Sequence, residues 1–306
     1  MEKLIIGVDN GYGFTKTVHS TLVSSLIESE SEPTFKNNVI CYDGRWYYLG
    51  QEPNDILNDK TENDNTYILT LMAIAEELKI KGITSAHVYL SVGLPLTKFS
   101  AQRDAFRKYF TRNNGIISFN YEDVNYKIEI DDNIIVSPQG YAAVVPMLSS
   151  LQEELVLVDI GTWTIDILPL KNNIPIQDKT DSLNEGVKTL IDSANKELRG
   201  AFGNGIPSNQ IQKVILKNNS TLNAEYKNIV EKEIRKYAEH IVGILGGMFN
   251  TDITSFVFIG GGASVIKNYG IDLVRNGVVI PEINVNAVGY EFIAKNKLMK
   301  EKGGRL

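Results

Sequence analysis

The sequence predicts a two-domain α/β protein built by duplication, and three observations support this class. Its 306 residues are enough for two domains of ordinary size. Short apolar runs typical of buried strands alternate with amphipathic helical stretches. A strand, an aspartate, a glycine-containing turn and a second strand follow one another around Asp9 and again around Asp159. The two halves therefore repeat one another in outline.

The composition is that of a globular protein and excludes several classes. Hydrophobic residues make up 43% and charged residues 22% of the chain, which argues against disorder and against a membrane protein. A net charge of -6 argues against direct binding to nucleic acid over the whole surface. The single cysteine and three histidines show no metal-ligand spacing. With no signal-peptide core and no membrane-spanning run, we expect a cytoplasmic protein.

The first domain is expected at residues 1–149 and begins with β-structure. Apolar runs predict an antiparallel meander of strands at 3–9, 14–20 and 21–27. The segment 38–50 predicts a hairpin, because Asp43-Gly44 tolerates positive φ at its turn. Residues 51–66 are polar and predict a loop. A small subdomain is expected at about 33–66.

Helices and strands then alternate to the end of the first half. A helix is predicted from Thr66, with apolar residues on one face, and ends at Gly82. A second helix follows Pro95, with Ser100 predicted as its N-cap. The remaining predicted elements are a strand at 86–94, a hairpin of strands at 115–121 and 126–132, and a strand that passes into a helix at Pro138-Gln139.

The second domain is expected at residues 150–306, and residues 153–170 repeat the opening of the chain. A small subdomain is expected at about 187–248, because helices are predicted at 186–200 and 223–248. A strand, a triple-glycine turn and a helix start follow at 255–268. A final helix is predicted at 286–298.

Glycine-rich turns can bind phosphate, because their backbone N–H groups point inward and no side chain blocks the approach. Gly11 and Gly13 suit this role in "DNGYGFTK", and Lys16 adds a point charge. Taken alone the signal is weak, since Asn-Gly is also a common hairpin turn.

Two further turns strengthen that interpretation. Asp159, Gly161 and Thr162 form a second cradle, and "IGGGAS" at 259–264 offers a flat surface for adenine or ribose. Each turn follows a buried strand, so the turns are expected at the carboxyl ends of strands, where α/β sheets bind ligands. Two carboxylates facing a nucleotide imply Mg²⁺ held through water and phosphate oxygens.

These segments resemble, in order, the five motifs of the actin, Hsp70 and sugar-kinase superfamily of ATPases. The motifs are phosphate-1 at 9–16, connect-1 at 137–145, phosphate-2 at 158–166, the adenosine motif at 259–264 and connect-2 at 286–294. Within the superfamily, "VGLPLTKF", "NEGVKTLIDSANKEL", "FIGGGASVI" and the compact length resemble the plasmid-segregation actins of the ParM type. The resemblance implies the actin-like, ribonuclease H-like duplicated fold, with ATP in the cleft between the two domains.

The resemblance also implies a function. Such a protein polymerises with ATP, hydrolyses it after assembly and disassembles unless its filament ends are protected. Its partners would be copies of itself and a DNA-bound adaptor protein at the filament ends, with no direct contact to DNA and none to membranes.

Roles for single residues follow from the same resemblance. Asp9 and Asp159 would organise Mg²⁺ through water, and Gln139 would orient the attacking water, since glutamine is no base at neutral pH. Some segregation actins have glutamate near Gln139, so the division of labour between Gln139 and Asp159 stays open. The implied nucleotide-binding residues are Asn10, Gly11, Tyr12, Gly13, Lys16, Gly161, Thr162, Gly186, Lys188, Gly260, Gly261, Gly262 and Ala263.

Several alternatives remain at this point. Lys188 can equally be a solvated helix residue, Asp166 a structural strand residue, and Trp163 either part of the phosphate pocket or packed outside it. The aromatic hairpin at 38–50 can be a filament contact or a subdomain core. The whole chain can also be a small-molecule kinase of the same fold, or an actin-like scaffold that binds ATP without hydrolysing it.

Overall fold

The computed structural model describes residues 1–51, 59–113 and 115–301. The chain divides into two compact units: unit 1 comprises Met1–Met147 with Asn284–Leu306, and unit 2 comprises Leu148–Ile283. The structure therefore groups the last helix with unit 1, whereas the sequence-based division assigns it to the second domain. Residues 52–58 of the expected loop and small subdomain lie outside the described residues.

Unit 1 contains a ten-stranded sheet among its described residues, in the order β3-β2-β1-β7-β9-β8-β5-β6-β4, with β10 also paired to β7. Its strands are β1 (Glu2–Asn10), β2 (Phe14–Lys16), β3 (Thr21–Val23), β4 (Leu26–Ser29), β5 (Val39–Tyr42), β6 (Arg45–Leu49), β7 (Ser85–Leu94), β8 (Ile116–Tyr121), β9 (Val124–Ile130) and β10 (Ile135–Pro138). Its helices are α1 (Asn65–Lys81), α2 (Leu96–Phe110), α3 (Tyr141–Val144) and α8 (Val285–Glu301).

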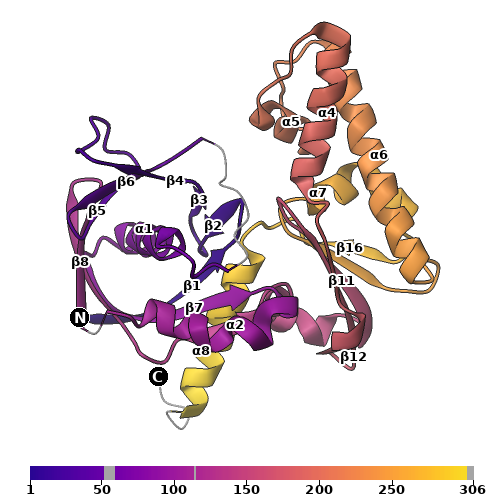
Figure 1. Cartoon of the computed structure of the whole chain (residues 1–306). Helices are drawn as coiled ribbons and strands as arrows, with labels where there is room; N and C mark the ends of the chain where they lie inside the picture. Colours follow the sequence, from indigo (N-terminus) through magenta and orange to yellow (C-terminus); the bar gives the residue numbers. More distant parts are fainter. Residues whose placement is uncertain (52–58, 114, 302–306) are drawn as a thin grey trace. The chain divides into compact units, whose positions relative to one another are not determined.

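The sheet of unit 1 curls around α1. Strands β3 and β4 lie at opposite ends of the strand order, yet only Ser24 and Ser25 separate them in the chain. The two ends of the sheet must therefore lie close together, and Figure 1 shows α1 surrounded by strands. Every residue of α1 from Thr66 to Ala75 is buried. This part of the helix is thus buried on all sides and not on the single face that its sequence pattern predicted.

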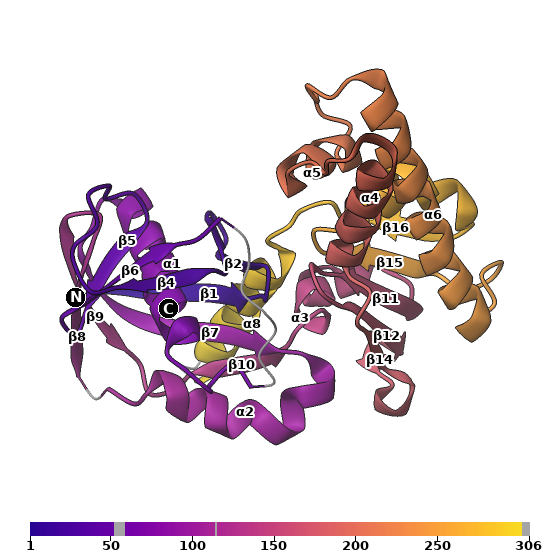
Figure 2. The ribbon, with the colours of Figure 1, turned by 45° about the horizontal axis from the view of Figure 1, so that its top comes forward.

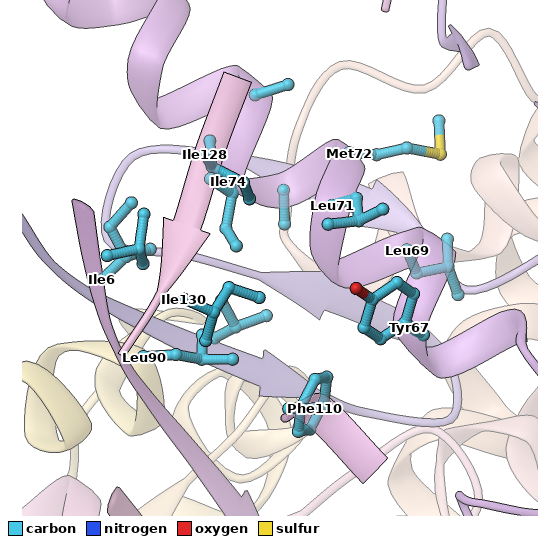
Figure 3. Close-up of a cluster of buried hydrophobic side chains, with 14 of the residues drawn as sticks. Ile6, Tyr67, Leu69, Leu71, Met72, Ile74, Leu90, Phe110, Ile128 and Ile130 are labelled. Carbon is cyan, nitrogen blue, oxygen red and sulfur yellow. The ribbon is translucent and has the colours of Figure 1, made fainter. Parts of the chain in front are cut away.

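The core of unit 1 lies between α1, the strands and α2. Figure 3 shows Leu71 and Ile74 of α1 near Ile128, Ile130 and Leu90 of the strands. Tyr67 stacks on Phe110 of α2, with ring centres 6.3 Å apart. Burying a side chain of this size contributes about 1.5–3 kcal/mol, so this cluster holds β1 and β7 in place.

The C-terminal helix α8 packs on β1, β7 and α3, and glycines permit the close approach. A Cβ atom on Gly7 would lie 2.3 Å from the carbonyl oxygen of Ala287, and one on Gly289 would lie 2.0 Å from that of Ala142. Gly93 likewise leaves room for the side chain of Tyr290. These contacts explain why α8 belongs to unit 1.

Unit 2 has a six-stranded sheet among its described residues, in the order β13-β12-β11-β15-β16, with β14 paired to β12. Its strands are β11 (Glu154–Ile160), β12 (Ile165–Lys171), β13 (Ile174–Pro175), β14 (Asp181–Leu183), β15 (Phe256–Ile259) and β16 (Gly277–Val279). Its helices are α4 (Val187–Phe202), α5 (Ser208–Ile215), α6 (Ala224–Met248) and α7 (Ala263–Val265). Figure 2 shows α4 and α6 side by side, as expected of two amphipathic helices.

Most other local predictions are confirmed, but those for residues 21–27 and for Ser100 are wrong. Gly82 ends α1 in the left-handed conformation, and Asp43 and Gly44 both have positive φ in the β5–β6 turn. Residues 21–27 do not form one strand, because β3 pairs with β2 whereas β4 pairs with β6. Ser100 does not cap a helix, because α2 begins directly after Pro95, whose backbone is extended.

No helix in the described residues is both long and apolar enough to cross a membrane.

Candidate functional site

The first turn, residues 11–13, joins β1 to β2 at the carboxyl end of β1. Asp9 pairs with Lys16 and Asn10 with Thr15 across this hairpin. The N–H of Gly11 donates to the carbonyl of Asp9 at 2.9 Å. A Cβ atom on Gly11 would lie 2.8 Å from the carbonyl oxygen of Phe14, so only glycine fits without a backbone shift. The predicted cradle and the predicted hairpin are thus the same structure.

Asp9 is buried beside a positive charge. Its side chain is 2% exposed, and its Oδ2 lies 3.2 Å from Nζ of Lys16. This Oδ2 atom accepts no hydrogen bond among the described residues. The ammonium of Lys16 is the opposite charge that a buried carboxylate group requires nearby. Asp9 is therefore a carboxylate with capacity left to bind a cation or its water.

Buried polar groups brace the first turn. Nδ2 of Asn10 donates to Oγ1 of Thr70 on α1 at 2.9 Å. The hydroxyl of Ser24 donates to the carbonyl of Gly11 at 2.7 Å, and the N–H of Ser24 donates to the carbonyl of Gly13 at 3.0 Å. The two bonds from Ser24 therefore satisfy the carbonyl groups of Gly11 and Gly13 and hold the turn in place.

Gln139 lies at the same edge of the unit 1 sheet as the first turn. Strands β1 and β10 both run parallel to β7, with Val8 opposite Val92 and Pro138 opposite Leu94. The three strands thus end together. The N–H of Gln139 donates to the carbonyl of Leu94 at 2.8 Å, and the side chain of Gln139 is half-buried.

The backbone next to Gln139 is fixed by α8. Gly140 has a φ of 76°, a conformation that favours glycine. Its N–H donates to Oδ1 of the buried Asn286 at 2.9 Å. The predicted connect-1 and connect-2 segments therefore meet in unit 1.

The second turn, residues 161–164, joins β11 to β12 in unit 2. Asp159 lies opposite Asp166, and the N–H of Gly161 donates to the carbonyl of Thr164 at 2.8 Å. Asp159 is 5% exposed and occupies the penultimate position of β11, as Asp9 does in β1. Each hairpin also has a parallel strand on its other side, β7 or β15. The predicted duplication is thus confirmed at the level of strand topology.

The start of α4 closes on the second turn. The N–H groups of Gly186, Val187 and Lys188 donate to the carbonyls of Trp163, Gly161 and Thr162 at 2.8–3.0 Å. A Cβ atom on Gly186 would lie 2.5 Å from the carbonyl oxygen of Thr162. Glycine at this position therefore shapes the turn.

Lys188 is placed beside the second turn by its backbone, whereas its ammonium forms an ion pair with Asp192 one helical turn further along α4.

The triple-glycine turn, residues 260–262, lies against Asp159. Gly260 has a φ of 85°, and a Cβ atom there would lie 2.4 Å from Oδ1 of Asp159. The N–H of Gly262 donates to the carbonyl of Ile160 at 2.8 Å. A Cβ atom on Gly261 would meet no atom within 4 Å. Gly260 and Gly262 are therefore closely packed, whereas Gly261 faces open space. Ala263 is buried at the start of α7.

The structure also places the two residues whose roles the sequence left open. Asp166 accepts a hydrogen bond from the hydroxyl of Ser182 on β14 at 2.5 Å, which gives it a structural contact. Trp163 is half-buried, and its Nε1 is buried without a hydrogen-bond partner among the described residues.

Sequence reasoning missed residues that reach the first turn from a distance. Ser24 and Thr70 contact it, and Lys60 donates a hydrogen bond to the carbonyl of Asn10. Lys60 lies in an Asn- and Asp-rich stretch that reads as a solvated loop. No local pattern indicates a partner fifty positions away.

The described residues contain no group of three or more His, Cys, Asp or Glu side chains that could hold a metal ion by themselves.

Two protein families match the sequence. Residues 7–141 match the family described as the N-terminal domain of actin like proteins. Residues 157–269 match the family described as archaeal actin homologue MreB-like, C-terminal. The first match covers the first turn, and the second covers the second and triple-glycine turns. No curated protein matches the chain significantly.

Solved structures match over nearly the whole chain. The archaeal actin homolog Ta0583 in complex with ADP has a TM-score of 0.73 at 21% identity, covering 96% of this chain and 99% of that chain. Bacillus thuringiensis ParM with ATP has a TM-score of 0.72 at 15% identity, covering 98% and 100%. A 15-stranded ParM filament from Clostridium botulinum has a TM-score of 0.74 at 18% identity, covering 97% and 100%. At these identities the likeness establishes the fold.

Proposed function

We propose that this chain, which has the two-domain fold of the actin-like proteins, is a Mg²⁺-dependent ATPase that polymerises with ATP and drives DNA segregation. One observation carries the proposal. Each unit ends a buried strand in an aspartate followed by a glycine turn, with Asp9 in unit 1 and Asp159 in unit 2. Each of these matched cradles offers backbone N–H groups of the kind that bind phosphate oxygens.

Phosphate binding would use the backbone of the two turns. Gly11 and Gly161 are each held by a hydrogen bond across their own turn, at 2.9 and 2.8 Å. These bonds engage the N–H groups of Gly11 and Gly161 themselves and fix the shape of the turns, so that other N–H groups of the turns would bind an anion without a large ordering cost. The open space beside Gly261 would receive the adenine or ribose. The ADP and ATP bound in the Ta0583 and ParM structures support a nucleotide as ligand.

Mg²⁺ fits the donor set of the chain. Asp9 and Asp159 are buried carboxylates, and Mg²⁺ is usually held by one or two carboxylates with waters and substrate phosphates. Gly260 leaves the space that Oδ1 of Asp159 occupies. When bound, the ion would neutralise phosphate charge, and Asp9 and Asp159 would orient its waters.

Hydrolysis would depend on Gln139 and Asp159. The backbone of Gln139 is fixed through Leu94, and that of its neighbour Gly140 through Asn286. A glutamine carried by a fixed backbone would orient a water molecule for in-line attack through its amide side chain. Asp159 would hold the ion that stabilises the developing charge.

Self-association is supported by a fold neighbour and by one exposed side chain. The Clostridium botulinum ParM structure is a filament. The aromatic hairpin expected as a contact is largely packed, since Tyr47 is 8% exposed and Trp46 and Tyr48 are half-buried. Phe35, in the loop before this hairpin, is 86% exposed and is the better contact residue.

The net charge of -6 fits a cytoplasmic filament that reaches DNA through an adaptor protein and not by direct binding.

Measurement of phosphate release separates this function from the alternatives. Purified protein with Mg-ATP is expected to release phosphate without any acceptor, and removal of Mg²⁺ with EDTA should abolish release. A small-molecule kinase would transfer phosphate only when a sugar or similar acceptor is added. A scaffold would bind ATP and release none. Either of these two results would overturn the proposed ATPase.

A further inference from the structure

A lysine outside the predicted cradles reaches the first turn. Lys60 lies in the segment before α1 and is 4% exposed. Its Nζ donates a hydrogen bond to the carbonyl of Asn10 at 2.5 Å. The same ammonium lies 5.2 Å from the ring centre of Tyr12. Both contacts are with the turn that Asp9 and Gly11 form.

The end of the segment that carries Lys60 is held by Tyr109 of α2 and by Arg112, two residues after α2. The hydroxyl of Tyr109 donates to the carbonyl of Asn63 at 2.7 Å. Arg112 forms an ion pair with Asp64 at 2.6 Å. Asn63 and Asp64, which follow Lys60 in this segment, are therefore tied to Tyr109 and Arg112.

Burial makes the charge of Lys60 effective. Charges interact more strongly where protein replaces water, so an ammonium beside the turn favours an anion bound there. Lys16, the lysine that the sequence assigned to phosphate, has its ammonium beside Asp9. Lys60 reaches the same turn through the carbonyl of Asn10.

We propose that Lys60 is a positioning residue of the nucleotide site, which holds the first turn in its phosphate-receiving form and adds a positive charge beside the bound phosphates. This inference rests on the proposed nucleotide binding. Its contribution must grow with the number of phosphates on the ligand, since adenosine carries no charge for Lys60 to attract.

The test compares the dissociation constants of adenosine, ADP and ATP, measured by calorimetry, in four proteins. These are the wild type, Lys60→Met, Lys60→Arg and a control, Lys108→Met, which removes an exposed lysine on α2. Lys60→Met is expected to weaken ATP binding by about tenfold and ADP binding by less. Adenosine binding should stay within about twofold, Lys60→Arg should restore most of the ATP affinity, and Lys108→Met should match the wild type.

The outcomes separate this inference from the proposed function. If the wild type binds no ATP, the proposed function fails. If the wild type binds ATP and Lys60→Met binds it equally well, or loses adenosine and ATP affinity by the same factor, the inference is overturned. Lys60→Gln keeps a hydrogen-bond donor but removes the charge. If Lys60→Met does not fold, Lys60→Gln replaces it, and the same weakening of ATP binding is expected.

Discussion

At the scale of single residues, Asp159 is the group around which unit 2 arranges its glycines. Gly260 makes room for its carboxylate, and Gly262 bonds to the neighbouring Ile160. A Cβ atom on Gly261, between them, would meet no atom within 4 Å. Substitution of Gly260 should therefore affect protein stability through packing, whereas substitution of Gly261 should affect nucleotide binding.

Gly260→Ala and Gly261→Ala are expected to differ in kind. The first places a Cβ 2.4 Å from Oδ1 of Asp159 at a φ of 85°, so we expect a loss of about 1–3 kcal/mol in unfolding free energy. The second should leave stability within about 0.5 kcal/mol and weaken nucleotide binding, since the methyl group would occupy ligand space. Thermal unfolding and ATP titration check both. Equal stability of the two variants would contradict the packing described for Gly260.

Asp159→Ala is expected to assemble with ATP but to release phosphate at least about tenfold more slowly, because the organiser of the Mg²⁺ is gone. Asp166→Asn is the control, because its partner Ser182 lies on β14 and its amide oxygen can still accept that bond. Pelleting and phosphate release are measured on both variants. If Asp159→Ala neither binds nucleotide nor folds, the metal-organising role has no support.

At the scale of elements, α8 links the end of the chain to the two strands that position the first turn and Gln139. Its glycine contacts with α3 and β1 leave no room for a methyl group. Its Asn286 holds the backbone beside Gln139. A substitution that disturbs this packing should therefore also lower the rate of ATP hydrolysis.

Gly289→Ala is expected to lower the unfolding free energy by about 1–3 kcal/mol, because the new Cβ would lie 2.0 Å from the carbonyl oxygen of Ala142. Phosphate release should fall with it. Gly243→Ala, within α6, meets no atom within 4 Å and should stabilise the protein by about 0.5–1 kcal/mol. Opposite shifts of the unfolding temperature are the expected result, and equal shifts would contradict the close contact of α8 with α3.

The interface of α8 with β1 should also make stability depend on pH. Burial raises the pKa of Glu291, and the nearby negative charge of Glu77 raises it further. The hydrogen bond from the N–H of Gly7 and the charges of His19 and Lys81 lower this pKa and so oppose the shift. Between the ordinary value of 4.5 and the raised folded pKa, the folded state holds more protons than the unfolded state. The free energy of unfolding therefore falls as the pH rises through this window.

Glu291→Gln removes this titration and keeps an oxygen for the N–H of Gly7, which now donates to Glu291 at 3.1 Å. We expect the variant to be more stable than the wild type at pH 7 and to show a flatter stability profile above pH 4.5. Exposed Glu2→Gln is the control. Denaturant unfolding across this pH range is the measurement, and an unchanged slope in Glu291→Gln would contradict the prediction.

At the scale of the whole molecule, local sequence patterns predicted most helices, strands and turns. The packing of these elements against one another could be known only from the structure. Asp43-Gly44 and Gly82 determine their own turns through backbone conformation, so their sequence interpretation was confirmed. The split between β3 and β4 depends on partners in β2 and β6, which the strand pattern does not reveal. Likewise, a helix at residues 286–298 was readable, but its place in unit 1 was not.

The candidate site shows the same division. The turns after Asp9 and Asp159 were predictable because strand, aspartate and glycine follow one another in sequence. The bonds that brace the first turn come from Ser24, Lys60 and Thr70, whose roles arise only when the sheet curls around α1.

ATP-dependent assembly followed by hydrolysis-linked disassembly is the central claim, and a sedimentation time course tests it most directly. Purified protein is mixed with Mg-ATP or Mg-ADP, and pelleted protein and released phosphate are followed together. We expect pelleting with ATP, which decays as phosphate appears, and none with ADP. Absence of pelleting with ATP at high protein concentration, or equal pelleting with ADP, would contradict the claim.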